Sequence, residues 1–155
     1  SLSGLYHLEG ATTSVLANGA THPDETVSSG GITLDFAITS GAVGLGYTSK
    51  MQTLRIEAGS SDGTSQGKPK RIHDVTLRFH ETVGAEVGTD AANADRIFCR
   101  DSSMDMDTAV PLFTGDKEIE FPGGFEEGDR IYVQQAQPLP MTVLALYPRM
   151  NTHDV

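Results

Sequence analysis

The acidic segment from Asp101 to Asp107 is the first place where residue types could do chemistry. Asp101, Asp105 and Asp107 alternate with Ser and Met residues, and carboxylate and hydroxyl oxygens are the ligands that Ca²⁺ prefers. An EF-hand loop also needs a glycine at its turn and a bidentate glutamate at its end, and both are missing here. We therefore expect a solvated acidic loop, with a Ca²⁺ site formed by the three aspartates as the alternative.

The histidines show no metal-binding spacing, because none of them belongs to an HxH or HExxH motif. Two of them, His73 and His80, lie seven positions apart. On a flat strand this puts them on opposite faces and roughly 23 Å apart, so they cannot share an ion. We expect structural or solvent-facing roles for all five, which are His7, His22, His73, His80 and His153.

Motifs of catalysis are equally weak. The carboxylates of residues 115–120 and 124–129 could supply a glycosidase pair, but the sequence singles out no two of them. Residues 59–63 lack the strand before and the helix after that a nucleophile elbow requires, and residues 41–46 have the wrong glycine order for a dinucleotide fingerprint. Cys99 is interpreted as a small strand residue. The sequence therefore predicts that the chain is not an enzyme and uses no cofactor.

Alternating apolar and polar residues predict strands as the elements that hold these groups. Residues 71–83 give the longest such pattern, and residues 32–38 repeat it. Asn18-Gly19 lies between two extended runs and predicts a tight hairpin, because this pair tolerates positive φ angles. Further strands are expected at residues 5–9, 43–47, 51–56, 95–100, 117–121, 130–135 and 141–147.

The run at residues 141–147 is apolar on both faces, which predicts a central strand or the closing strand of a barrel. Pro138 and Pro140 before it and Pro148 after it are expected to delimit this strand, since proline is poorly tolerated within a central ladder. No segment shows a sustained helical period. We predict one all-β domain over residues 1–155, built as a β-sandwich or partly closed β-barrel of about nine or ten mostly antiparallel strands.

Composition and charge limit the partners of this fold. The 155 residues include 17 glycines and 7 prolines, as in a protein with many short turns, and the lone cysteine excludes an internal disulfide. A net charge of −10 repels phosphate backbones and anionic membranes. The short basic run at residues 68–71 is expected to serve solubility or subunit contact. Because the chain opens on a strand-like run without an initiator Met, we expect it to continue upstream.

Several short motifs follow one another along the chain. They are LEG at residues 8–10, VLANGA at 15–20, HP at 22–23, GYTSKMQTL at 46–54, GKPKRIH at 67–73, PLFTGDK at 111–117, FPGGF at 121–125 and PLPMTVLAL at 138–146. Together they cover nearly the whole chain. In their order they resemble a passage found late in large tail proteins of short-tailed phages and related prophages. The chain thus resembles the C-terminal portion of a tail tubular or nozzle-type structural protein.

This resemblance implies a role without catalytic residues. Proteins of this class assemble as rings below the portal and form part of the DNA exit channel. The implied partners are copies of the chain, neighbouring tail proteins and passing DNA that is not bound specifically, with no membrane. The implied locations are the virion tail and, during assembly, the host cytoplasm.

A glycan-binding module of a phage tail is the alternative function. Tyr47, Phe113, Phe125 or Tyr132 would then form a stacking platform for sugar rings. Tryptophan, which such sites often use, is absent, and these four aromatics are widely spaced. The sequence therefore favours the structural role.

Overall fold

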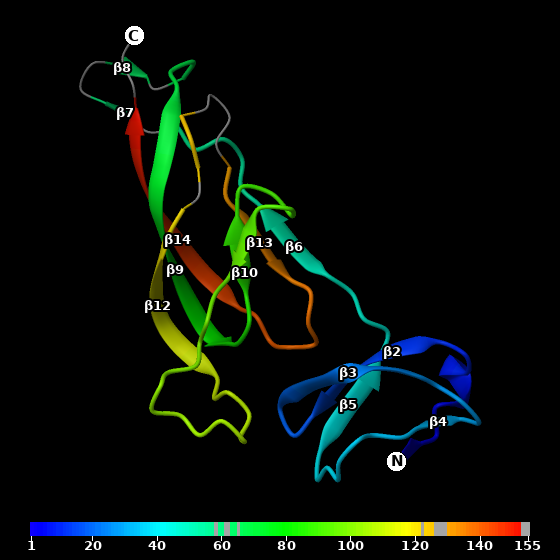
Figure 1. Ribbon diagram of the computed structural model, residues 1–155. Helices are drawn as coiled ribbons and strands as arrows, with labels where there is room; N and C mark the ends of the chain where they lie inside the picture. Colours follow the sequence, from blue (N-terminus) through cyan, green and yellow to red (C-terminus); the bar gives the residue numbers. More distant parts are fainter. Residues whose placement is uncertain (58, 61–62, 65, 122, 126–129, 153–155) are drawn as a thin grey trace.

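The chain folds almost entirely into antiparallel β-sheets, as Figure 1 shows for the computed structural model. The structure describes residues 1–57, 59–60, 63–64, 66–121, 123–125 and 130–152. Strands make up 48% of the chain and helix 2%, which confirms the predicted all-β fold class. Within these residues no sheet closes into a barrel, so the architecture is sandwich-like. The described residues form fourteen strands, more than predicted, because four have only two residues.

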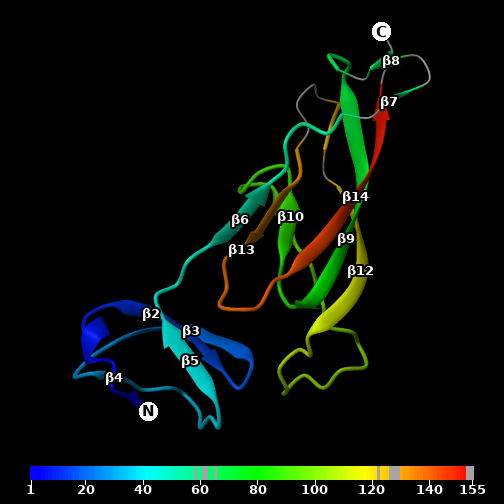
Figure 2. The same ribbon diagram turned by 180° about the vertical axis from the view of Figure 1, so that it is seen from behind.

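The strands divide into two lobes, which residues 45–48 connect (Figures 1 and 2). The smaller lobe, residues 1–44, holds a three-stranded sheet of order β3–β2–β5, a two-stranded sheet β1–β4 and one short 3₁₀ helix, η1. Their bounds are β1 Leu2–Ser3, η1 Tyr6–Leu8, β2 Thr12–Ala17, β3 Ala20–Thr26, β4 Gly31–Ile32 and β5 Gly41–Gly44.

The larger lobe, residues 49–152, is a sandwich of two sheets. The first has four strands in the order β11–β10–β13–β6, and the second has three in the order β12–β9–β14. Their bounds are β6 Ser49–Gln52, β9 Lys70–Thr82, β10 Glu86–Gly88, β11 Ala94–Arg96, β12 Phe113–Glu120, β13 Tyr132–Gln135 and β14 Val143–Thr152. A small hairpin, β7 (Gly59–Ser60) and β8 (Gly63–Thr64), lies outside both sheets.

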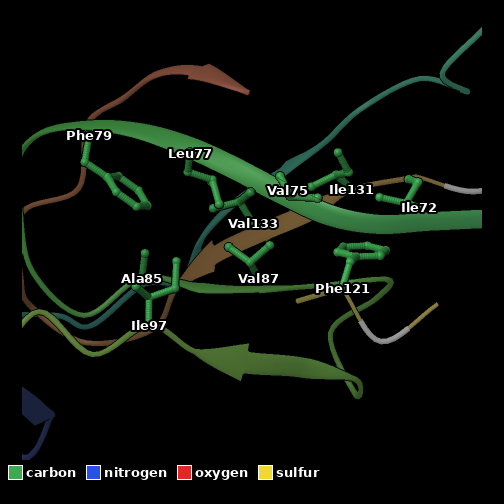
Figure 3. Close-up of a cluster of buried hydrophobic side chains, with 10 residues drawn as sticks. All are labelled: Ile72, Val75, Leu77, Phe79, Ala85, Val87, Ile97, Phe121, Ile131 and Val133. Atoms are coloured by element: carbon green, nitrogen blue, oxygen red, sulfur yellow. The ribbon is translucent and has the colours of Figure 1, made fainter. Parts of the chain in front are cut away.

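Each lobe has its own hydrophobic core, and the two cores share no residue. In the larger lobe, side chains from β9 meet side chains from β10 and β13 across the sandwich (Figure 3). This core consists of Ile72, Val75, Leu77, Phe79, Ala85, Val87, Ile97, Phe121, Ile131 and Val133. The core of the smaller lobe consists of Val15, Val27, Ile32 and Leu34. The prediction of one domain over residues 1–155 stays a prediction.

Local signals correctly placed the two most regular features. The predicted strand at residues 71–83 is β9, in which Val75, Leu77 and Phe79 are buried while the side chains between them are not. The predicted hairpin is the turn between β2 and β3. There Asn18 and Gly19 have φ angles of 50° and 83°, which is the conformation a tight turn of this kind requires.

Two of the predicted strands in the smaller lobe are wrong. Residues 5–9 contain η1 instead, and the Glu9 carboxylate accepts hydrogen bonds from the backbone N–H groups of Ser29 and Gly30 at 2.8 and 2.7 Å. This segment is thus held to the turn at Ser29 and Gly30 by a side chain and does not form part of a β-ladder. Of residues 32–38, only Ile32 belongs to a strand, because the partner strand β1 offers two residues for pairing.

The predicted central strand at residues 141–147 is also wrong in position and extent. It is β14, an edge strand that pairs with β9 on one side and runs on through Pro148 to Thr152. Its Leu144 side chain is 60% exposed. Proline is tolerated here because an edge strand has one side without ladder hydrogen bonds. The remaining predicted strands exist with shifted ends, and β10 was not predicted.

Candidate interaction surface

A groove of about 570 Å³ lies where the two lobes meet. Its walls come from β2 and β5 of the smaller lobe, from the connection at residues 45–47 and from the loop at residues 135–140 of the larger lobe. The side chains that line it are largely apolar, among them Leu16, Val43, Leu45, Tyr47 and Leu139. Such a groove suits an apolar partner segment better than a charged substrate.

Close packing determines where the connection runs on the smaller-lobe side. A Cβ atom at Gly46 would lie 2.5 Å from the hydroxyl oxygen of Ser14 on β2, so any larger residue at this position would require the Ser14 side chain to move. The connection consequently carries the side chains of Leu45 and Tyr47 at the groove, where both are exposed.

The Gln135 side chain holds the opposite wall in place. The buried Gln135 donates a hydrogen bond from Nε2 to the carbonyl oxygen of Val83 at 2.7 Å, and its Oε1 accepts one from the backbone N–H of Gln137 at 3.1 Å. These bonds lead the chain out of β13 into Pro138-Leu139-Pro140. Both prolines are exposed and fix the backbone of this wall.

The two lobes interact little outside the groove. No hydrogen bond or salt bridge between described residues joins residues 1–48 to residues 49–152. One close approach is at the hairpin turn, where a Cβ atom on Gly19 would lie 3.4 Å from that of Ala109. The groove is therefore lined by two units that are largely held together by their connection.

An exposed apolar segment continues from the groove along the edge of the larger lobe. We call residues 45–54 the edge segment; it includes β6, which pairs on one side with β13 and lies at the end of its sheet. Tyr47 and Leu54 are 80% and 84% exposed, and Leu45 and Met51 are exposed as well. Pairing persists one residue beyond β6, since the Thr53 N–H donates to the carbonyl oxygen of Ile131 at 2.9 Å.

The opposite end of the sandwich presents acidic side chains. Strand β12 carries Asp116, Glu118 and Glu120 on the outer face of its sheet, all exposed. Arg78 of β9 donates two hydrogen bonds to the Asp116 carboxylate, at 2.7 and 2.8 Å, and its guanidinium lies 5.5 Å from the centre of the Tyr147 ring. These hydrogen bonds from Arg78 hold the pKa of Asp116 below its ordinary value.

The aspartates considered for Ca²⁺, Asp101, Asp105 and Asp107, are not gathered into a cluster in the part of the chain that the structure describes. Within the described residues, no group of three or more His, Cys, Asp or Glu side chains is placed to hold an ion. Instead the Arg100 guanidinium donates to the carbonyl oxygens of Asp105 and Thr108, while the Asp101 carboxylate accepts from Ser102 and from the backbone of Ser103. The Arg100 side chain therefore holds this loop by binding its backbone carbonyl groups.

The other residues considered for chemistry are dispersed. The buried His22 ring bonds to backbone atoms, with Nδ1 2.9 Å from the carbonyl oxygen of Pro23 and Nε2 accepting from the Asp35 N–H at 3.4 Å. Cys99 is buried. His73 and His80 lie on β9, and His7 lies in η1. Ser61, Glu126, Glu127, Asp129 and His153 lie outside the described residues.

The four aromatics of the glycan alternative have different environments. Tyr132 is buried, and its hydroxyl donates to Gln134 at 3.0 Å. The Phe113 ring lies 4.7 Å from the ammonium group of Lys117 and is half-buried. Tyr47 and Phe125 are exposed, and of the four only Tyr47 lines the groove. The structure therefore offers at most one of them to a ligand there.

Comparisons with known proteins add no family. No protein-family model matches the chain, and no curated protein matches it. Among the described residues there is no helix long and apolar enough to cross a membrane.

Proposed function

We propose that this chain is a structural module of a phage or prophage virion, part of the tail tube or nozzle. In this role it binds copies of itself and neighbouring tail proteins and catalyses no reaction. Its locations would be the virion tail and, during assembly, the host cytoplasm. The ordered motifs shared with tail proteins suggest the role, and the surface of the larger lobe supports it.

The observation that carries the proposal is the exposed edge segment, residues 45–54. Its large apolar side chains lie along an open strand edge and beside an apolar groove. Single soluble chains usually protect such edges, because unpaired backbone groups next to apolar side chains bind other chains. A protein that assembles with other chains needs a surface of this kind, in which exposed apolar side chains lie beside an open strand edge.

The acidic charge fits the same role. With a net charge of −10, most of the surface repels DNA phosphates, so passing DNA would not adhere to it. The charged face of β12 and β9 illustrates this, since Asp74, Asp116, Glu118 and Glu120 outnumber Arg78 and Arg149 there.

Sedimentation velocity of the 155-residue chain over a range of concentrations tests the proposal, followed by negative-stain electron microscopy. We expect association that grows with concentration, and closed rings among the particles. A chain that stays monomeric at every concentration would refute the assembly role.

A second function, glycan binding, is favoured by one observation, the exposed Tyr47 ring at the apolar groove. Calorimetric titration with host surface polysaccharide measures it directly. Saturable binding that Tyr47→Ala abolishes, and that Phe125→Ala leaves unchanged, would establish the glycan site in place of an assembly contact.

A further inference from the structure

The open strand edges of the three larger sheets differ in how well they are protected. Strand β3 contains Pro23, and β14 contains Pro148 and two bulges, features that natural proteins use to prevent edge pairing. Strand β11 has only three residues, and β5 contains two glycines. Strand β12 has one bulge, between Phe113 and Gly115, and is in regular register from Gly115 to Glu120. The edges that remain available for pairing are β6 and this regular part of β12.

These two edges have complementary charge. The edge segment around β6 carries Lys50 and no acidic residue, with Arg55 directly after it. The outer face of β12 carries Asp116, Glu118 and Glu120. Because the chain as a whole is strongly acidic, two copies repel each other except where such a basic segment meets an acidic one.

The two strands also match face by face. Met51 of β6 is aligned with the buried Val133 of β13, so Met51 lies on the core side and Lys50 on the outer side. On β12, Ile119 lies on the core side, aligned with Val75, and Glu120 on the outer side. A β6 strand placed beside β12 would therefore extend both the apolar face and the charged face of the sheet.

Glu120 is the acidic residue of β12 that forms no salt bridge among the described residues. Asp116 is paired with Arg78, and Glu118 with Arg149 at 3.3 Å. Glu120 is directly opposite Asp74 across the β9–β12 ladder. Arg149, which is opposite Asp74 across the β9–β14 ladder, forms its salt bridge with Glu118 and not with Glu120. Like charges directly opposite one another destabilise a strand pair, and a cation from outside would relieve this.

We propose that β6 of one copy pairs with β12 of the next copy, with Lys50 of the neighbouring copy facing Glu120. This inference rests on the proposed assembly function and identifies its contact. Figures 1 and 2 show β6 and β12 on opposite flanks of the larger lobe. The contact is therefore head-to-tail, the type that closes into a ring when the rotation between copies permits.

Charge reversal tests this contact, with sedimentation velocity at low ionic strength as the measurement. Lys50→Glu and Glu120→Lys should each weaken association about tenfold or more, since a like charge then faces the acidic or basic edge. The double variant, and an equimolar mixture of the two single variants, should restore it. Arg71→Glu on the central strand β9 and Asp24→Lys on β3 are matched controls and should change little.

The outcomes separate this contact from the assembly role itself. Association that ignores both charge reversals, or that neither the double variant nor the mixture restores, overturns the β6–β12 contact and leaves the proposed function standing. An unchanged chain that never associates overturns both. All four substituted side chains are exposed, so circular dichroism should show an unaltered fold.

Discussion

Replacing Leu77 with alanine is the most direct test of how the larger lobe is held together. Leu77 is fully buried on β9, the central strand of its sheet, between Lys117 of β12 and Leu146 of β14. Truncation removes buried methyl groups and leaves a cavity between two packed sheets. Such replacements cost about 2–5 kcal/mol, and we expect about 3 kcal/mol here because neighbours on both sheets restrict collapse of the cavity.

Urea unfolding followed by far-UV circular dichroism gives this free energy. Leu144→Ala is the matched control: it makes the same chemical change on β14, at a side chain that is 60% exposed, and should alter the free energy of unfolding by no more than about 0.5 kcal/mol. A loss below about 1 kcal/mol for Leu77→Ala, or an equal loss in the control, would refute the reasoning that β9 anchors the core.

Hydrogen exchange of the same variant shows how far the damage spreads. The two cores share no residue, and no hydrogen bond between described residues crosses from one lobe to the other. We therefore expect Leu77→Ala to lower amide protection in residues 70–152 and to leave Val15 and its neighbours in β2 protected. Equal loss of protection in both lobes would instead support the single domain predicted from the sequence.

Three further predictions concern single contacts. NMR titration should place the pKa of Asp116 below its ordinary value, and Arg78→Gln should return it; the ion pair is present above the carboxyl's ordinary pKa and is lost as pH falls through the lowered one. Gly46→Ala should destabilise the groove wall, and Ser14→Gly in the same chain should relieve it, as Tm measurements would show. Millimolar Ca²⁺ should leave amide shifts at residues 101–107 unchanged, since Arg100 bonds the loop carbonyls.

Sequence reasoning succeeded where the deciding interactions are local. The period of β9 follows from the alternation of side chains along one strand, and the hairpin follows from the backbone freedom of Asn18 and Gly19. The acidic character of β12 is likewise visible in the sequence. These features can be predicted without knowing which strands pair with one another.

The groove and the open edges could not be predicted in this way, because they depend on contacts distant in sequence. Leu45 and Tyr47 line the same groove as Pro138 and Leu139 because β6 pairs with β13, which brings these distant segments together. The order in which strands pair decides whether a strand lies at the centre or at the edge of its sheet. The residue types of β6 and β13 do not indicate this order.

The exposed side chains of β14 bear on the proposed function. Its apolar residues predicted burial on both faces, yet within one chain β14 is an edge strand that leaves Leu144 and Tyr147 exposed. The edge segment shows the same discrepancy at Leu54. Apolar side chains are costly to leave in water, so a sequence that keeps them on the surface of a single chain fits a protein whose neighbours bury them. The mismatch between predicted and observed burial is thus itself a reason to propose assembly.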